Sequence, residues 1–288
     1  MEGFEGGWFD GCKGAMIIDA HQHFWNPARG DYFWMVGEAV TPIARVIGPK
    51  DLAPHLARHG VSKTVLVQAA PTIAETEYML GIADATEHVA KVVGWVDFEN
   101  RGDLRQLERL KKHPKFSGVR PMIQDLPDPE WMHRKDVAWA FQAIVDLDLT
   151  FDALGFPEHL EPFLRLFRRF PKMRVVVDHC MKPRVREEGF ASWAEGIERI
   201  AQETAVFCKF SGLATEAKAG WTNETLRPYT AHVLKCFGVR RVMWGSDWPV
   251  LNLNGSYAKW FSAALELVPK VDHEAVFGKT AGDFYRII

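Results

Sequence analysis

The sequence predicts a single closed (β/α)8 barrel, an α/β fold, and three observations support this prediction. Eight short apolar or β-branched segments recur along the chain, stretches with helical periodicity separate them, and no linker or break in composition divides the chain. Strands that alternate with helices favour a parallel sheet, and 288 residues suffice for a barrel of about 250 residues. The sequence contains no G-x-G-x-x-G or Walker-type loop, which counts against an open nucleotide-binding sheet.

The predicted strands are short runs that are rich in Val, Ile, Phe and Leu. Such runs are typical of parallel strands that are buried on both faces. The eight predicted strands cover residues 16–20, 63–69, 91–98, 116–123, 149–154, 173–179, 205–212 and 241–247.

Helices are predicted between these strands because apolar residues recur there at a spacing of three or four. This spacing places the apolar side chains on one face, which can pack against the sheet. The clearest examples are residues 51–60, 75–91, 102–113, 136–147 and 158–170.

The first fifteen residues differ from the rest of the chain. They are rich in Gly and acidic, and they lack the basic and apolar regions of a signal peptide. Met16 stands directly before the first predicted strand. We therefore expect residues 1–15 to form an N-terminal tail or extension and residues 16–288 to form the barrel.

The amino-acid composition indicates which kinds of binding partner the protein has. The chain has 35 basic and 37 acidic residues, and this balance argues against a nucleic-acid or membrane partner. No run of eighteen apolar residues occurs, and the four cysteines form no C-x-x-C pair. We expect a cytoplasmic protein with reduced thiols that binds a small molecule, and the number of subunits stays open.

Titratable side chains stand at the C-terminal ends of three predicted strands. His21 and His23 end the first strand two positions apart, so their side chains point the same way. His179 ends the sixth strand and Asp247 the eighth. Active sites of (β/α)8 barrels lie where the C-terminal strand ends meet. We therefore predict that these four side chains surround one cavity and are the catalytic residues.

Four longer strings refine this hypothesis. IDAHQHFW, VDHCMKP, CKFSGL and WGSDWPV together resemble the amidohydrolase superfamily, in the branch of sugar-acid and pyrone-dicarboxylate lactonases. The resemblance covers residues 16–288 and implies a TIM-type barrel that hydrolyses a sugar-acid lactone, with L-fucono- and L-rhamnono-type lactones favoured. A metal-dependent decarboxylase or lactonase that acts on an aromatic or dicarboxylic acid is the alternative.

The resemblance also raises the question whether the active site binds a metal ion. Metal-dependent relatives commonly have a further ligand histidine after the fifth strand, where this chain has Asp152. His21, His23 and Asp247 would still offer three ligands to one divalent ion such as Zn²⁺. We expect that such an ion can bind and that catalysis does not require a cofactor.

Lactone hydrolysis needs a base for water, polarisation of the carbonyl group and an acid for the leaving alkoxide. We assign Asp247 as the base, and His179 as the group that orients the water or polarises the carbonyl. His21 and His23 would stabilise the tetrahedral intermediate. Asp178 should point to the opposite face of its strand from His179 and serve packing or loop hydrogen bonds.

Polar and aromatic side chains near the strand ends are predicted to bind substrate. A guanidinium group forms forked hydrogen bonds with carboxylates or hydroxyl pairs, amides bond neutral hydroxyls, and indoles pack against the C–H face of a sugar. The predicted substrate-binding residues are Arg120, Gln68, Gln124, Trp34, Trp25, Trp248, Asp152 and Lys182.

Overall fold

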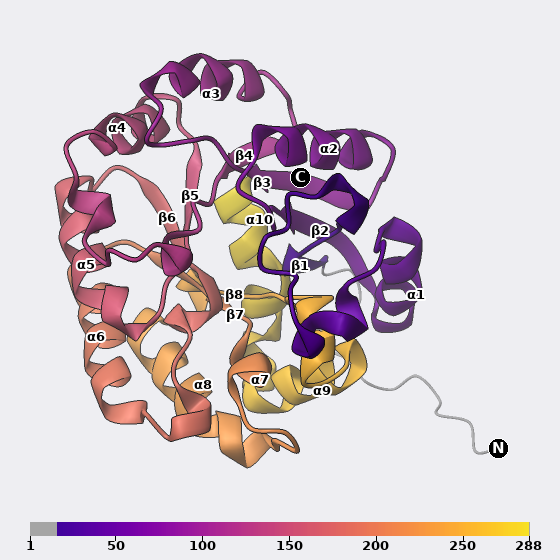
Figure 1. Ribbon diagram of the computed structural model, residues 1–288. Helices are drawn as coiled ribbons and strands as arrows, with labels where there is room; N and C mark the ends of the chain where they lie inside the picture. The colour runs from indigo at the N-terminus through magenta and orange to yellow at the C-terminus, as the bar shows by residue number, and fades with distance from the viewer. Residues whose placement is uncertain (1–15, 288) are drawn as a thin grey trace.

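The computed structural model describes residues 16–287 and shows eight parallel strands in the sequential order β1 to β8. Helices surround the ring of strands (Figure 1). The predicted barrel is therefore confirmed, and the prediction for residues 1–15 lies outside the described residues. The strands are β1 Ile17–Gln22, β2 Val61–Val67, β3 Val89–Gly94, β4 Phe116–Val119, β5 Thr150–Ala153, β6 Arg174–Val177, β7 Phe207–Phe210 and β8 Val242–Trp244.

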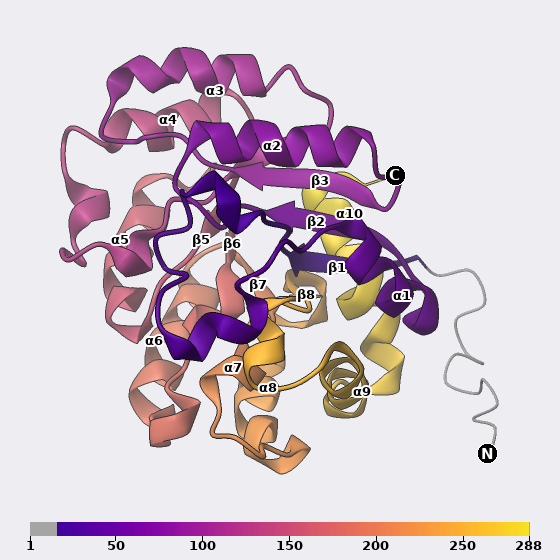
Figure 2. The same cartoon turned by 45° about the vertical axis from the view of Figure 1, so that its right-hand side comes forward.

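The α-helices lie mainly between consecutive strands, as Figure 2 shows from a second side. Within residues 16–287, no helix is long and apolar enough to cross a membrane. The helices are α1 Pro49–His59, α2 Ile73–Asp84, α3 Leu104–Leu110, α4 Ala138–Asp146, α5 Leu160–Arg169, α6 Phe190–Glu203, α7 Leu213–Glu216, α8 Asn223–Phe237, α9 Tyr257–Leu267 and α10 Thr280–Tyr285.

Local sequence signals explain where α1 and α2 begin and end. Helix α1 starts with Pro49 and ends before Gly60, which adopts a φ of 67° that favours glycine. The hydroxyl of Thr72 accepts a hydrogen bond from the N–H of Glu75 and caps α2. The predicted helix 75–91 is too long, because α2 ends at Asp84 and β3 already begins at Val89.

The ring closes between β1 and the segment that follows β8. The N–H of Asp247 donates to the carbonyl of His21 over 2.8 Å, and the N–H of His23 donates to the carbonyl of Trp248 over 2.8 Å. These bonds bring two of the predicted catalytic segments together across the seam.

Helix α10 packs against apolar side chains inside the barrel. The carbonyl of Phe284 accepts a hydrogen bond of 2.8 Å from Arg174, the first residue of β6, which places α10 at the N-terminal end of the strands. The interior cluster consists of Ile18, Ala20, Val65, Val67, Val93, Val176, Met243, Ala281, Phe284 and Tyr285.

Candidate active site

The end of β1 presents His21 and His23 to the site. The pairing of β1 with β2 shifts register between Asp19 and Gln22, beside His21. Asp19 fixes this segment, because its carboxylate accepts hydrogen bonds from the N–H groups of His21 and Ser246 at 3.2 and 2.8 Å. His23 Nδ1 lies 2.8 Å from the Val67 carbonyl, so Nδ1 carries a proton and donates it.

His179 lies in a tight left-handed turn directly after β6. Its φ is 52°, a backbone conformation that costs free energy in a non-glycine residue. The Ser211 hydroxyl lies 2.9 Å from His179 Nδ1 and holds the ring. Gly212, at a φ of 71°, packs so closely that an added Cβ atom would lie 2.7 Å from the Cβ of His179.

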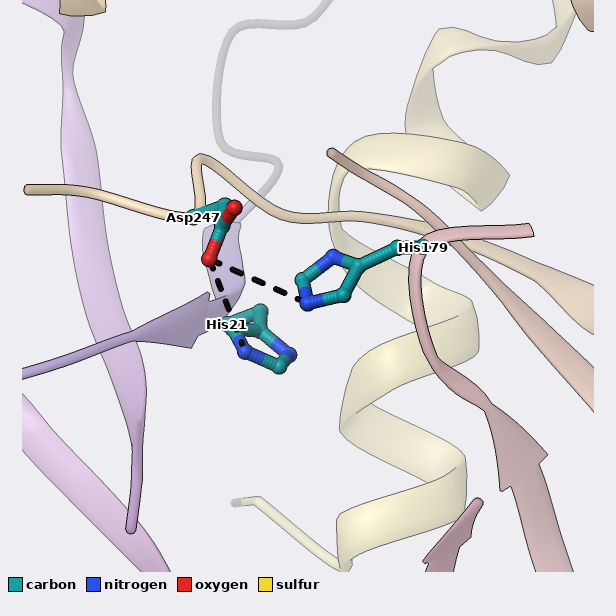
Figure 3. A group of neighbouring side chains, drawn as sticks. All are labelled: His21, His179 and Asp247. Carbon is teal, nitrogen blue, oxygen red and sulfur yellow. Dashed lines mark ion pairs between the residues drawn. The ribbon is translucent and has the colours of Figure 1, made fainter. Parts of the chain in front are cut away.

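The carboxylate of Asp247 lies close to the imidazoles of His21, His23 and His179. Its Oδ1 lies 3.3 Å from Nε2 of His23 and 3.8 Å from Nε2 of both His21 and His179. Figure 3 shows the carboxylate and the rings of His21 and His179 pointing toward one another. All four residues are at least 95% buried. The structure therefore brings together the four predicted catalytic residues, and we call the three imidazoles the site histidines.

Burial sets the charges of this cluster. It lowers the pKa of His21 and His179 well below 6.5 and also lowers the pKa of His23. Burial by itself would raise the pKa of Asp247, but the interaction of the carboxylate with the protonated forms of His179 and His23 outweighs it and leaves that pKa below 3.8. At neutral pH the site thus contains one ionised carboxylate among three uncharged imidazoles.

Lys209 of β7 lies next to this cluster and was missed by the sequence analysis. Its ammonium nitrogen is fully buried, 2.5 Å from Asp152 Oδ2, 3.0 Å from Asp178 Oδ1 and 3.1 Å from His21 Nδ1. An ammonium group has three donors and no acceptor, so Nδ1 of His21 accepts. The proton of neutral His21 therefore lies on Nε2, which faces His23.

A signal for Lys209 was present in the sequence. Lysine is almost never fully buried unless it is paired, and Lys209 stands between Cys208 and Phe210 in a strand that must be buried in a parallel sheet. A buried acidic partner was therefore to be expected.

The prediction for Asp178 was wrong. Its carboxylate faces the site, 3.4 Å from Arg120 Nη1 and 3.5 Å from His21 Nδ1, and does not lie on the opposite face of the strand. Strand β6 ends at Val177, and the left-handed turn that follows breaks the alternation of side chains. Asp178 and His179 can therefore both face the barrel axis.

The cluster opens into a cavity of about 160 Å³, which we call the catalytic cavity. His23, His179 and Asp247 reach it, whereas His21 is fully buried and is not among its lining residues. Five of the predicted substrate-binding residues also line this cavity, namely Arg120, Gln124, Trp25, Trp34 and Lys182.

The remaining predicted substrate-binding residues do not line the cavity. The amide of Gln68 donates to the carbonyl of Arg120 over 2.5 Å and so supports the backbone of that residue. Asp152 is bound to Lys209 and also accepts a hydrogen bond of 2.7 Å from the Tyr285 hydroxyl. The indole of Trp248 is buried, with its ring centre 6.3 Å from that of Phe24.

The donor set suits a divalent metal ion. Ligand atoms of His21, His179 and Asp247 lie within 4.8 Å of one another. Nε2 of His23 is 3.2 Å from Nε2 of His21, so the predicted ligand set of His21, His23 and Asp247 is also close together. Imidazole nitrogens and a carboxylate oxygen are common ligands of Zn²⁺. These residues therefore fit a single ion of this kind.

A (β/α)8 barrel with histidines after β1 and β6 and an aspartate after β8 around one cavity defines a class of barrel enzymes that use acid–base or metal-assisted chemistry. The chain belongs to the amidohydrolase family, because residues 18–287 match the family model described as Amidohydrolase.

Individual relatives cover nearly the whole chain. The chain is 41% identical to an L-fucono-1,5-lactonase of Burkholderia ambifaria over 94% of this chain and 95% of that protein. It is 30% identical to an L-fucono-1,5-lactonase of Burkholderia multivorans, over 95% and 97% of the two chains. The crystal structure of an amidohydrolase from Burkholderia multivorans with bound zinc is similar with a TM-score of 0.90 and 29% identity, over 95% of this chain and 100% of that chain.

Proposed function

We propose that this protein hydrolyses the lactone of a sugar acid to the open-chain acid, with L-fucono- and L-rhamnono-type lactones as the favoured substrates. The observation that carries the proposal is the ionised Asp247 carboxylate among three neutral imidazoles at a cavity for a small molecule. Two relatives that match over nearly the whole chain are named for lactone hydrolysis, which supports this function over the alternative decarboxylase. Such a reaction belongs to sugar catabolism.

Asp247 acts as the general base in this proposal. It takes a proton from a water molecule while the water oxygen attacks the carbonyl carbon of the lactone. His23 and His179 flank the carboxylate and orient the water. When the tetrahedral intermediate collapses, the bond to the ring oxygen breaks and the leaving alkoxide takes the proton back from Asp247. The products are the acid and a regenerated carboxylate.

Arg120 and Lys182 stabilise the negative charge that develops on the carbonyl oxygen. Both line the catalytic cavity and carry fixed positive charges. Arg120 is held in place because its Nη2 donates to the carbonyl of Gln68 and its Nη1 lies 3.4 Å from Asp178. His21 acts as a positioning residue, because it lies next to the cavity without lining it.

A bound divalent ion would be held by His21, His23 and Asp247, with His179 close by, and would polarise the lactone carbonyl. We propose that catalysis does not require it. Nη1 of Arg120 lies 3.4 Å from Nε2 of His21 and the Lys209 ammonium lies 3.1 Å from its Nδ1, so both ring nitrogens of His21 already face a cationic group, which weakens His21 as a metal ligand. The β5 position that could add a ligand is Asp152, which is already bound to Lys209.

The experiment is a pH-indicator screen of aldonolactones with the purified protein and with an Asp247→Asn variant. We expect release of acid from at least one lactone, and a loss of turnover of about 10² or more in the variant, the scale of a missing general base. Asp136→Asn is the control, because Asp136 is an exposed aspartate that pairs with Arg134 and does not line the catalytic cavity. Near-normal turnover of Asp247→Asn would remove Asp247 from the base role, and no acid release from any lactone would refute the function.

A further inference from the structure

A second, larger cavity lies beside the catalytic cavity. Its volume is about 480 Å³, within the range of about 300–1,000 Å³ that small-molecule sites occupy. We call it the aromatic cavity. It is lined by the segments that follow β1, β2, β3 and β4, namely Phe33, Trp34, Pro71, residues 95–99, Pro121, Met122, Asp125, Leu126 and Trp131.

The two cavities share walls. Trp34, Met122 and Asp125 line both of them. The indole N–H of Trp34 donates to the carbonyl of Ala69 over 2.7 Å, which fixes the ring between the two cavities. A substituent on a molecule in the catalytic cavity can therefore extend toward the aromatic cavity.

The walls of the aromatic cavity combine flat apolar faces with hydrogen-bond acceptors. The ring of Trp131 is fixed, because its N–H donates to the Glu99 carboxylate over 2.6 Å. Trp95 is half-buried, and Phe33 at the rim is 70% exposed. Carboxylates of Asp97, Glu99 and Asp125 add acceptors, and Asp97 and Asp125 add negative charge, whereas Glu99 is paired with Arg134 over 2.9 Å.

This combination fits an uncharged sugar ring. The apolar C–H face of a sugar packs on an indole, and its hydroxyl groups donate to carboxylates. The carboxylates of Asp97 and Asp125 disfavour an anionic group, so the acid end of the product does not bind here. The catalytic cavity, at about 160 Å³, holds the lactone ring, and the aromatic cavity is three times as large.

We infer that the aromatic cavity binds a second, neutral sugar ring attached to the lactone, so that the substrate is the lactone of a glycosylated sugar acid. This inference rests on the proposed lactone hydrolysis and leaves its chemistry unchanged, because only the ester bond of the lactone ring breaks. The glycosidic bond stays intact, and the second ring contributes binding through the aromatic cavity.

The test compares the aldonolactone that the protein hydrolyses best with the same lactone carrying a β-D-glucosyl group on O3 or O4. We expect KM to fall about fivefold to tenfold for one of the glucosylated lactones, the scale of one aromatic stacking contact. If the parent lactone is hydrolysed and neither derivative has a higher kcat/KM, this inference is overturned and the proposed function stands. If no lactone is hydrolysed, the proposed function itself fails.

Substitutions test whether the aromatic cavity causes the preference for the glucosylated lactone. Trp95 lines the aromatic cavity and not the catalytic cavity, so Trp95→Ala should remove most of the ratio of kcat/KM between the glucosylated and the parent lactone. Trp95→Phe retains an aromatic face and should keep part of the ratio. Phe190→Ala is the control, because Phe190 is also a half-buried aromatic residue, and neither it nor its ring neighbours Trp193 and Tyr229 line either cavity. A ratio that survives Trp95→Ala would place the second ring elsewhere and overturn the inference.

Discussion

Replacement of Lys209 by methionine tests the buried charge network beside the active site. The substitution keeps an unbranched side chain but removes an ammonium group that contacts Asp152, Asp178 and His21 at 2.5, 3.0 and 3.1 Å. Two fully buried carboxylates then lose their shared counter-charge. Removal of one partner from a buried ion pair costs about 3–5 kcal/mol.

The remaining contacts place the expected loss near the lower end of this range. Arg120 still lies 3.4 Å from Asp178, and the Tyr285 hydroxyl still donates to Asp152 over 2.7 Å. We therefore expect Lys209→Met to lower the free energy of unfolding by about 3 kcal/mol at pH 7. Without Lys209 the pKa of the Asp152 or Asp178 carboxyl group rises in the folded state. At pH 5 this carboxyl group can bind a proton, so the loss of unfolding free energy should be larger at pH 8 than at pH 5.

The assay is urea unfolding at pH 5, 7 and 8, followed by far-ultraviolet circular dichroism and by tryptophan fluorescence. Coincident transitions justify a two-state analysis. The double variant Lys209→Met/Asp152→Leu removes one of the two carboxylates and should recover part of the loss. An unfolding free energy of Lys209→Met within about 1 kcal/mol of the unmodified protein, the scale of an exposed ion pair, would refute the role assigned to this network.

Three further predictions concern the active site. The pKa values of the site histidines are lowered from 6.5 and that of Asp247 from 3.8, so kcat/KM should stay constant from pH 8 down to 6.5 and fall only at lower pH. An inflection of the pH profile at or above 6.5 would contradict these shifts. Gly212→Ala should lower kcat about tenfold or more, because the added methyl group displaces the His179 ring. Gly220 also has a positive φ, but no atom lies within 4 Å of an added Cβ, so Gly220→Ala should affect only stability. Equal kcat values for the two variants would contradict the packing argument. Exhaustive chelation should leave most of the lactonase activity, and loss of activity that returns in proportion to added Zn²⁺ would refute metal independence.

The barrel and the cluster of Asp247 with the three site histidines were predictable because each depends on short-range sequence patterns. Eight apolar runs determine the number of strands, and polar residues at strand ends meet by topology alone. The exact strand ends were less predictable. The predicted strand 241–247 is Val242–Trp244 in the structure, so Asp247 lies beyond the strand, in a loop at a φ of 57°.

The residues that surround the catalytic cluster, such as Asp152 and Asp178, are held by contacts that no sequence pattern predicts. Tyr285 reaches Asp152 from α10, a helix that enters the barrel at the end opposite the catalytic cavity. No spacing rule connects these two residues. Asp178 was assigned to the wrong face because the period of two applies only while the chain remains a strand.

The hydrogen bonds between β1 and the segment after β8 have a consequence for biosynthesis. Asp19 and Ser246 are 227 positions apart and are joined by a hydrogen bond of 2.8 Å beside the catalytic cluster. A ribosome must therefore add the residues that separate these two positions before β1 and the segment after β8 can meet, and contacts at such separation form slowly. The rate at which catalytic activity returns during refolding would consequently report how fast β1 joins the segment after β8.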